Sequence, residues 1–199
     1  MQPFSPRLAD LPAEIAVFPL TGALLLPRGR LPLNIFEPRY IKMVHDSIER
    51  GVPIALSLED PTELDGVPIV VGYGSPQVLE TRPDGSMVIV LKGAGRAELD
   101  EVVETEPYIT CRAIRRPEFD EVSPENNAPL ERLRRRLWRW ADESIAEPEQ
   151  RAAVVVGFST PQRIIEALAM IMVRDTDLRQ AILEMDDLNE RIKLMKFLC

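Results

Sequence analysis

Very few residues of this 199-residue sequence are of the types that carry out covalent or metal chemistry. There is one histidine, His45, and there are two cysteines, Cys111 and Cys199. A Ser-His-Asp or Cys-His nucleophile would have to use His45, but no Gly-x-Ser-x-Gly elbow is present. One histidine and two distant cysteines cannot form a His-Glu-x-x-His motif or a zinc tetrad. We therefore predict no catalytic residue, no metal site and no disulfide, with His45 on the flank of a helix.

Two glycine-containing stretches raise the question of a nucleotide site. They are residues 72–74 (Gly-Tyr-Gly) and residues 93–96 (Gly-Ala-Gly-Arg). Neither completes a phosphate-binding loop or a Gly-x-Gly-x-x-Gly fingerprint ahead of a helix. Glycines inside strand patterns mark bulges or places where another backbone approaches closely. We predict that role for them, and no cofactor.

An arginine-rich run between residues 132 and 139 is the one locally basic segment, and tryptophans accompany it. Basic and aromatic residues together are typical of nucleic-acid binding, so RNA binding through Arg132–Arg139 is the alternative function. However, Leu133, Leu137 and Trp140 recur at helical spacing, which predicts a helix that packs inward with its arginines in solvent. The chain has 24 basic and 32 acidic residues, a net charge of -8, which opposes polyanion binding.

The overall composition is that of a globular protein, with 45% hydrophobic and 28% charged residues. A chain of this length buries about 70% of its unfolded surface, enough for a stable core. No run of about 18 apolar residues is present, and the first residues do not form a secretion signal or a transit peptide. We expect a cytoplasmic protein without membrane contact, and reduced thiols.

The first part of the sequence predicts short strands, because glycines and prolines punctuate brief apolar runs. The residues 82–85 (Arg-Pro-Asp-Gly) predict a hairpin turn. One helix is expected to begin at Pro38 and to end at Gly51. The expected strands are 15–20, 31–36, 53–58, 67–71, 78–81, 87–92, 94–103 and 108–114.

The second part of the sequence changes to a helical period after a polar segment that contains three prolines. We predict a β-rich lobe over residues 10–116, a linker over 117–129 and a helical lobe over 130–199. Pro148 separates the first two helices. Thr160 with Pro161, and Asp187 with Glu190, predict two further helix starts.

Three ordered blocks of sequence resemble the N-terminal, substrate-binding domain family of the Lon proteases. They are residues 17–40 (VFPLTGALLLPRGRLPLNIFEPRY), 90–99 (VLKGAGRAEL) and 181–192 (AILEMDDLNERI). The resemblance runs from about Ile15 to the end of the sequence, which makes it far more specific than any single motif.

The resemblance implies an α+β fold, in which a PUA-like β pseudo-barrel precedes a small α-helical bundle. It implies recognition of unfolded or partner protein segments, with homo-oligomerisation left open, and no catalytic residue. We find no phosphate loop that would bring ATP hydrolysis. The PUA-like fold is also the basis of the RNA-binding alternative.

The same family block contains the candidate peptide-binding surface. It consists of large apolar residues near the start of the chain: Leu24, Leu25, Leu26, Phe36 and Tyr40. The competing interpretation is that these residues belong to the core, since only a contiguous exposed apolar patch would indicate binding.

Overall fold

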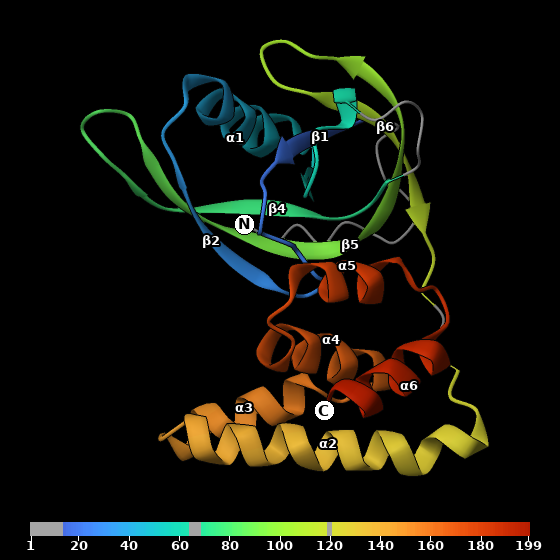
Figure 1. Ribbon diagram of the computed structural model, residues 1–199. Helices are drawn as coiled ribbons and strands as arrows, with labels where there is room; N and C mark the ends of the chain where they lie inside the picture. The colour runs from blue at the N-terminus through green and yellow to red at the C-terminus, as the bar shows by residue number, and fades with distance from the viewer. Residues whose placement is uncertain (1–13, 64–68, 119–120) are drawn as a thin grey trace. The chain divides into compact units, whose positions relative to one another are not determined.

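The computed structural model describes residues 14–63, 69–118 and 121–199, and the chain divides into two compact units between Arg116 and Pro117 (Figure 1). Unit 1 holds the strands together with one long helix, and unit 2 is helical. This is the predicted α+β class, with strands first and helices second. No helix in the described ranges is long and apolar enough to cross a membrane.

The strands of unit 1 form one sheet that closes on itself. Their order is β2-β5-β4-β3-β1-β6, and β6 pairs with β5 as well as with β1, so that the sheet forms a ring (Figure 1). The β1–β3 pair is parallel and the other pairs are antiparallel. The bounds are β1 (Glu14–Pro19), β2 (Arg30–Ile35), β3 (Ile54–Ser57), β4 (Ile69–Thr81), β5 (Met87–Glu104) and β6 (Thr110–Arg116).

Helix α1 (Pro38–Arg50) covers the main core of unit 1. Pro38 occupies its first turn, and Gly51 ends it at a φ of 71°, as the sequence predicts. Its buried side chains, among them Met43 and Val44, pack with inward-facing residues of β1, β2, β3 and β5. A short 3-10 turn, η1 (Pro61–Glu63), follows β3.

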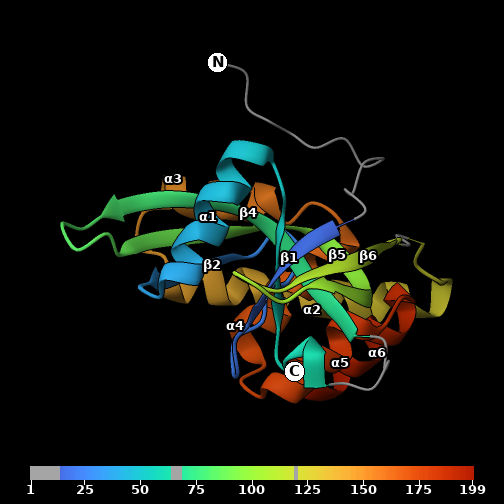
Figure 2. The ribbon, with the colours of Figure 1, turned by 90° about the horizontal axis from the view of Figure 1, so that it is seen from above.

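Strands β4 and β5 are longer than the sequence predicts, because each continues through its glycines. A Cβ on Gly72 would lie 1.6 Å from the carbonyl oxygen of Leu25, and one on Gly93 would lie 2.2 Å from that of Leu26. The register also shifts between Tyr73 and Gly74, as at a β-bulge. The glycines therefore let another backbone cross the strands instead of ending them. Figure 2 shows the long β4–β5 hairpin projecting past α1.

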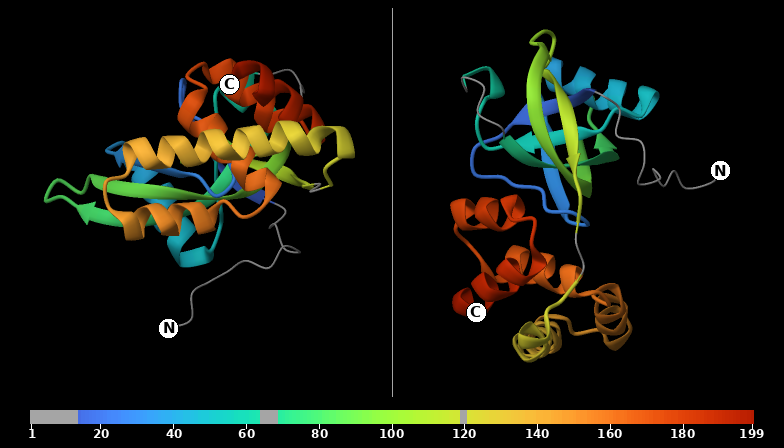
Figure 3. Two further views of the ribbon diagram at one scale, coloured as in Figure 1. Left: turned by 90° about the horizontal axis from the view of Figure 1, so that it is seen from below. Right: turned by 90° about the vertical axis from the view of Figure 1, so that its right-hand side faces the viewer.

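Unit 2 consists of α2 (Pro124–Ser144), α3 (Pro148–Gly157), α4 (Pro161–Met172), α5 (Thr176–Glu184) and α6 (Leu188–Leu198). Helix α2 packs against α4 and α6, and α3 runs beside it (Figure 3). The helix begins at Pro124, inside the predicted linker, so that Pro129 lies within the helix. Pro124 is at the first position of the helix, where a missing N–H has no partner to lose, whereas Pro129 has no N–H to donate to the carbonyl of Glu125 one turn earlier.

The amide of Asn189 joins the starts of α2 and α6. Its Oδ1 accepts hydrogen bonds from the Ser123 N–H (2.8 Å) and from Asn126 Nδ2 (3.0 Å). Its Nδ2 donates to the Glu121 carbonyl (3.1 Å) and to Asp187 Oδ1 (3.0 Å). Asp187 also caps α6, as predicted, by accepting from the Asn189 N–H. The second predicted cap is present at Thr160, which accepts from the Arg163 N–H.

Candidate protein-binding surface

The five residues predicted as a peptide-binding surface separate into core and surface. Leu25 and Leu26 are 1% and 2% exposed, and Tyr40 is 8% exposed. Leu24 is half-buried. Phe36 alone of the five is largely exposed, at 71%. The core interpretation thus fits three of the residues, and Phe36 and Leu24 remain as candidates for contact with a partner.

Leu25 and Leu26 are buried because their segment crosses the glycines of β4 and β5. The Leu25 carbonyl lies over Gly72 and the Leu26 carbonyl over Gly93. Hydrogen bonds between Gly93 and residues 28 and 29 hold the segment in place, at 2.9 Å each. The Leu25 side chain enters the main core. These leucines position the loop that precedes β2, and they present no side chain to a partner.

Tyr40 has a comparable structural role on α1. Its ring packs against Phe18, with centroids 4.2 Å apart, and the Arg39 guanidinium lies 4.5 Å from its centroid on the surface side. Arg39 in turn binds Glu37 at 2.9 Å, and this hydrogen bond raises the pKa of Arg39. Burial raises the pKa of the Tyr40 phenol. An aromatic pair covered by a cation in this way anchors α1 to the sheet.

Phe36 lies at the end of the sheet formed by the β4–β5 hairpin and β2. It follows Ile35, which pairs with Met87, which pairs with Thr81 of β4. Leu79, 58% exposed, lies at the same end of β4. We call Phe36, Leu79 and the half-buried Val88 the hairpin-end surface.

The strand alternation explains why these apolar residues face solvent. Ile35, Met87 and Ile89 point into the core, so their neighbours along each strand, including Val88, point outward. Sequence reasoning did not nominate Leu79. The signal that could have identified Leu79 is its position next to the predicted turn at residues 82–85, because a strand that leads into such a turn extends past the core.

The outer edge of β2 is the other feature through which unit 1 could bind a chain segment. Within the described strands, β2 pairs with β5 only. Pro32 lies in the middle of β2, where a strand added to the open edge would miss one N–H donor. Side-chain contact at the hairpin-end surface is therefore better supported than strand addition.

Residues with possible covalent or metal chemistry lie apart from this surface. His45 is exposed on α1, as predicted. Cys111 is buried in β6, and burial raises the pKa of its thiol to about 11. Among the described residues, no group of three or more histidines, cysteines and carboxylates could hold a metal ion. A shallow acidic depression is lined by Pro19, Thr21, Leu58, Glu59, Asp60 and Glu63.

The arginine-rich run lies on α2 of unit 2. Leu133 and Leu137 are buried and Trp140 is half-buried, which confirms the predicted inward face. Trp138, which the sequence analysis did not separate from Trp140, is 49% exposed.

Comparison with known proteins finds bacterial Lon proteases among the relatives of this chain. The chain is 26% identical over 190 residues to the Lon protease of Flavobacterium johnsoniae, and 24% identical over 187 residues to that of Syntrophomonas wolfei. Each match covers 92% of this chain but 23% of the relative. The chain therefore spans about a quarter of the length of these proteases.

Two solved structures share the fold. The Lon N-terminal domain protein from Xanthomonas campestris has a TM-score of 0.63 and 22% identity, over 90% of this chain and 95% of that one. The N-terminal domain of Mycobacterium avium complex Lon protease has a TM-score of 0.68 and 18% identity, over 93% and 97%. Residues 14–198 match the family model of the ATP-dependent protease La (LON) substrate-binding domain. The chain belongs to this Lon substrate-binding domain family.

Proposed function

We propose that this chain is a binding module that recognises unfolded or partner protein segments and does not itself carry out a reaction. The observation that carries the proposal is the family match, which extends over residues 14–198 and is to a substrate-binding domain. The site chemistry agrees with it: the described residues include large exposed apolar side chains, and the thiol of Cys111 is buried and protonated at neutral pH.

We place recognition at the hairpin-end surface. Phe36 and Leu79 are large apolar side chains held in water by the end of a sheet, and burial of each such side chain contributes about 1.5–3 kcal/mol. An unfolded segment supplies apolar side chains that a folded protein would bury. Ordering that segment costs entropy, so binding of single segments should be weak and tolerant of sequence.

The test uses an uncharged fluorescein-labelled peptide in which leucine and phenylalanine alternate with serine, measured by fluorescence anisotropy. Phe36→Ser should weaken binding about tenfold, as expected for an apolar anchor worth ~1.4 kcal/mol. Phe197→Ser is the matched control, because Phe197 of unit 2 is even more exposed, at 88%. Phe197→Ser should leave the affinity within twofold of the wild-type value. The peptide should remain intact, since we propose that the chain carries out no reaction.

Binding should also be insensitive to salt, since apolar contacts are not screened. The placement at the hairpin-end surface is wrong if Phe36→Ser and Phe197→Ser weaken binding equally. Failure of the wild-type chain to prefer the apolar peptide over a glycine-serine peptide of the same length would contradict the proposed function itself.

A further inference from the structure

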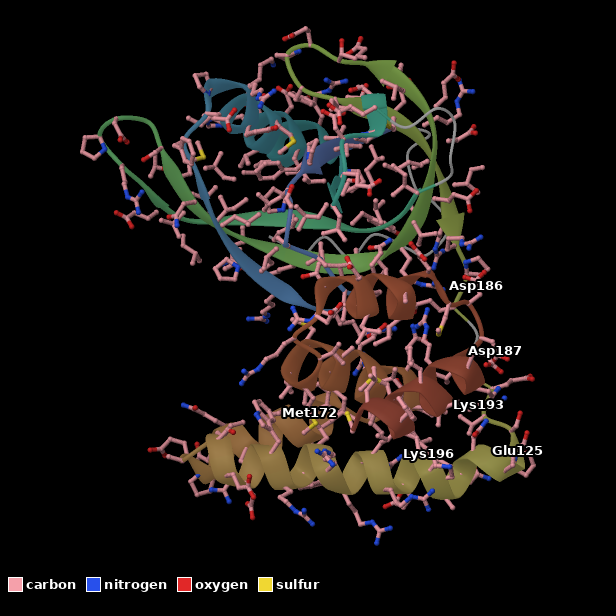
Figure 4. All side chains as sticks on the ribbon, viewed as in Figure 1. Glu125, Met172, Asp186, Asp187, Lys193 and Lys196 are labelled. Atoms are coloured by element: carbon pink, nitrogen blue, oxygen red, sulfur yellow. The ribbon has the colours of Figure 1, made fainter. Side chains whose placement is uncertain are left out.

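Helix α2 carries four arginines on its exposed side, with Arg136 at the flank nearest α4. Arg132, Arg135, Arg136 and Arg139 are spaced i, i+3, i+4 and i+7, and all four are exposed. We call these four residues the arginine stripe. The buried residues Leu133, Leu137 and Ala141 lie on the other side, toward α4 and α6. Figure 4 shows side chains of α2 extending away from the other helices of unit 2.

The stripe lacks the carboxylate partners that several other cations of the molecule have. Within the described residues, Arg132, Arg135 and Arg139 form no hydrogen bond or ion pair, and Arg136 donates to the neutral sulfur of Met172 at 3.3 Å. Met172 lies beside α2 in Figure 4. Elsewhere, Arg39, Lys42, Arg116 and Lys193 each contact a carboxylate at 2.9, 2.9, 3.0 and 2.8 Å.

This arrangement is unfavourable for the isolated helix. Like charges at i, i+3 and i, i+4 spacing repel each other, and the stripe contains several such pairs. Glu131 and Glu143 lie four residues from Arg135 and Arg139, but within the described residues neither forms an ion pair with them. The chain has eight more acidic than basic residues, so carboxylates that could neutralise the stripe are plentiful in it. Four arginines left without them are complementary to an external anion.

The ends of the stripe limit the size of that anion. Arg132 and Arg139 are seven residues apart, about 10 Å along a helix, which corresponds to roughly three residues of an extended peptide. Glu125 and Glu143 follow on the same face at either end, and Figure 4 shows Glu125 at the start of α2. A nucleic-acid backbone would continue past the stripe and meet these carboxylates, whereas a short acidic peptide segment ends within it.

Trp138 provides an apolar contact beside the stripe. It is half exposed and lies one helical turn after Arg134 and Arg135. The crevice lined by Trp138, Leu137 and Phe158 has a volume of about 10 Å³, room for about one water. A bound aromatic or aliphatic side chain would therefore lie on the indole surface and not in the crevice.

We propose that the arginine stripe with Trp138 is a second docking surface, which binds a short acidic segment of a partner protein that carries an adjacent apolar residue. The proposal rests on the proposed function only in taking the ligand to be a protein. It concerns unit 2, and it is independent of the hairpin-end surface.

The experiment measures the anisotropy of a labelled peptide with the core Glu-Asp-Glu-Phe, in which three acidic residues precede the apolar one, and of its amide counterpart Gln-Asn-Gln-Phe, on the full chain. The acidic peptide should bind at least tenfold more tightly. Arg135→Glu with Arg139→Glu should abolish this preference, and Arg135→Lys with Arg139→Lys should largely retain it. Arg174→Glu is the matched control, since Arg174 is exposed in unit 2, forms no hydrogen bond or ion pair among the described residues and lies off the stripe. Each Glu substitution should leave the thermal midpoint of the circular dichroism signal essentially unchanged.

The proposal is wrong if the two peptides bind equally, if the stripe and Arg174 variants have equal effects, or if a 12-nucleotide RNA binds more tightly than the acidic peptide. A wild-type dimer in sedimentation equilibrium that the stripe substitutions dissociate would show that a second copy occupies the surface, and would overturn it as well. Raising the salt concentration from 0.05 to 0.5 M should weaken binding of the acidic peptide at least tenfold. The same change in salt should not alter the affinity for the uncharged peptide that tests Phe36, so the two proposals can fail separately.

Discussion

The two units position their surfaces by different means. In unit 1, glycines 72 and 93 accept the backbone of residues 25 and 26, and strand pairing carries Phe36 to the end of the sheet. In unit 2, side-chain caps and the Asn189 amide fix where helices begin. The stability of unit 1 should therefore fall when a side chain is added where two backbone segments touch, and that of unit 2 when particular hydrogen bonds are lost.

The exposed surfaces of the two units differ in polarity, and so do the ligands that we propose for them. The exposed face of unit 1 is apolar at Phe36 and Leu79, and the exposed face of α2 in unit 2 is cationic with an aromatic neighbour. Unfolding of the two units can be followed separately. Both tryptophans, Trp138 and Trp140, lie in unit 2, so tryptophan fluorescence reports on that unit alone.

The largest effect is expected for Gly72→Ala. Its Cβ would lie 1.6 Å from a backbone oxygen that no side-chain movement can displace, so we expect a loss of more than about 4 kcal/mol in the stability of unit 1. Urea unfolding followed by circular dichroism measures it. Gly157→Ala is the control, because nothing lies within 4 Å of its Cβ. A Gly72→Ala protein with wild-type stability would contradict the close backbone crossing.

Asn189→Ala should destabilise unit 2 by about 2 kcal/mol. The substitution removes hydrogen bonds to Ser123 and to Asn126, and Asn126 is buried and would be left without its partner. Tryptophan fluorescence during urea unfolding should show the shift. Asn127→Ala, at an exposed position of α2, should change the free energy of unfolding by less than about 0.5 kcal/mol. Equal shifts for the two variants would mean that Asn189 does not join the helix starts.

Local signals in the sequence predicted most of the helix and turn boundaries. Pro38, Gly51, Thr160 and Asp187 act within one helical turn of their own position, so a short window of sequence contains the whole cause. The turn at residues 82–85 is equally local, with Gly85 at a φ of 85°. The change from short apolar runs to a helical period predicted the order of the strand-rich and helical parts, and the family resemblance agrees with that order.

The features that the sequence did not predict depend on distant residues. The sequence predicts a bulge or a close backbone approach at residues 72 and 93, but nothing near them in sequence identifies residues 25 and 26 as the segment that crosses them. The start of α2 depends in part on Asn189, 63 residues from Asn126. Leu25 and Phe36 are equally apolar in sequence, and only the tertiary path of the loop buries one and exposes the other.

Tyr108→Phe should have a moderate effect on unit 1 that depends on pH. The Tyr108 hydroxyl donates to Asp46 Oδ2 at 2.6 Å, and this bond lowers the pKa of Asp46 below its ordinary 3.8. The charged form of Asp46 is therefore favoured by folding, and its contribution is present above pH 3.8 and lost as pH falls through the lowered value. We expect a cost of about 1 kcal/mol at pH 7, shrinking toward pH 3.

Burial and the bond to Asp46 also raise the pKa of Tyr108 from 10 to about 12. A phenol whose pKa is raised by folding stabilises the protein below pH 10 and loses that contribution as pH rises toward 12. The wild-type chain should lose stability over this range in urea titrations by circular dichroism, and Tyr108→Phe should lose less. Parallel curves for the two proteins between pH 3 and pH 11 would contradict this contact.

The smallest effect is expected at an exposed ion pair of unit 2. Lys193 binds Glu190 at 2.8 Å on the surface of α6, with both side chains more than half exposed. Solvent screens such a pair, so Lys193→Met should change the free energy of unfolding by less than about 0.5 kcal/mol, measured by tryptophan fluorescence. A loss as large as that of Asn189→Ala would mean that surface charge, and not the buried amide, holds the helices of unit 2 together.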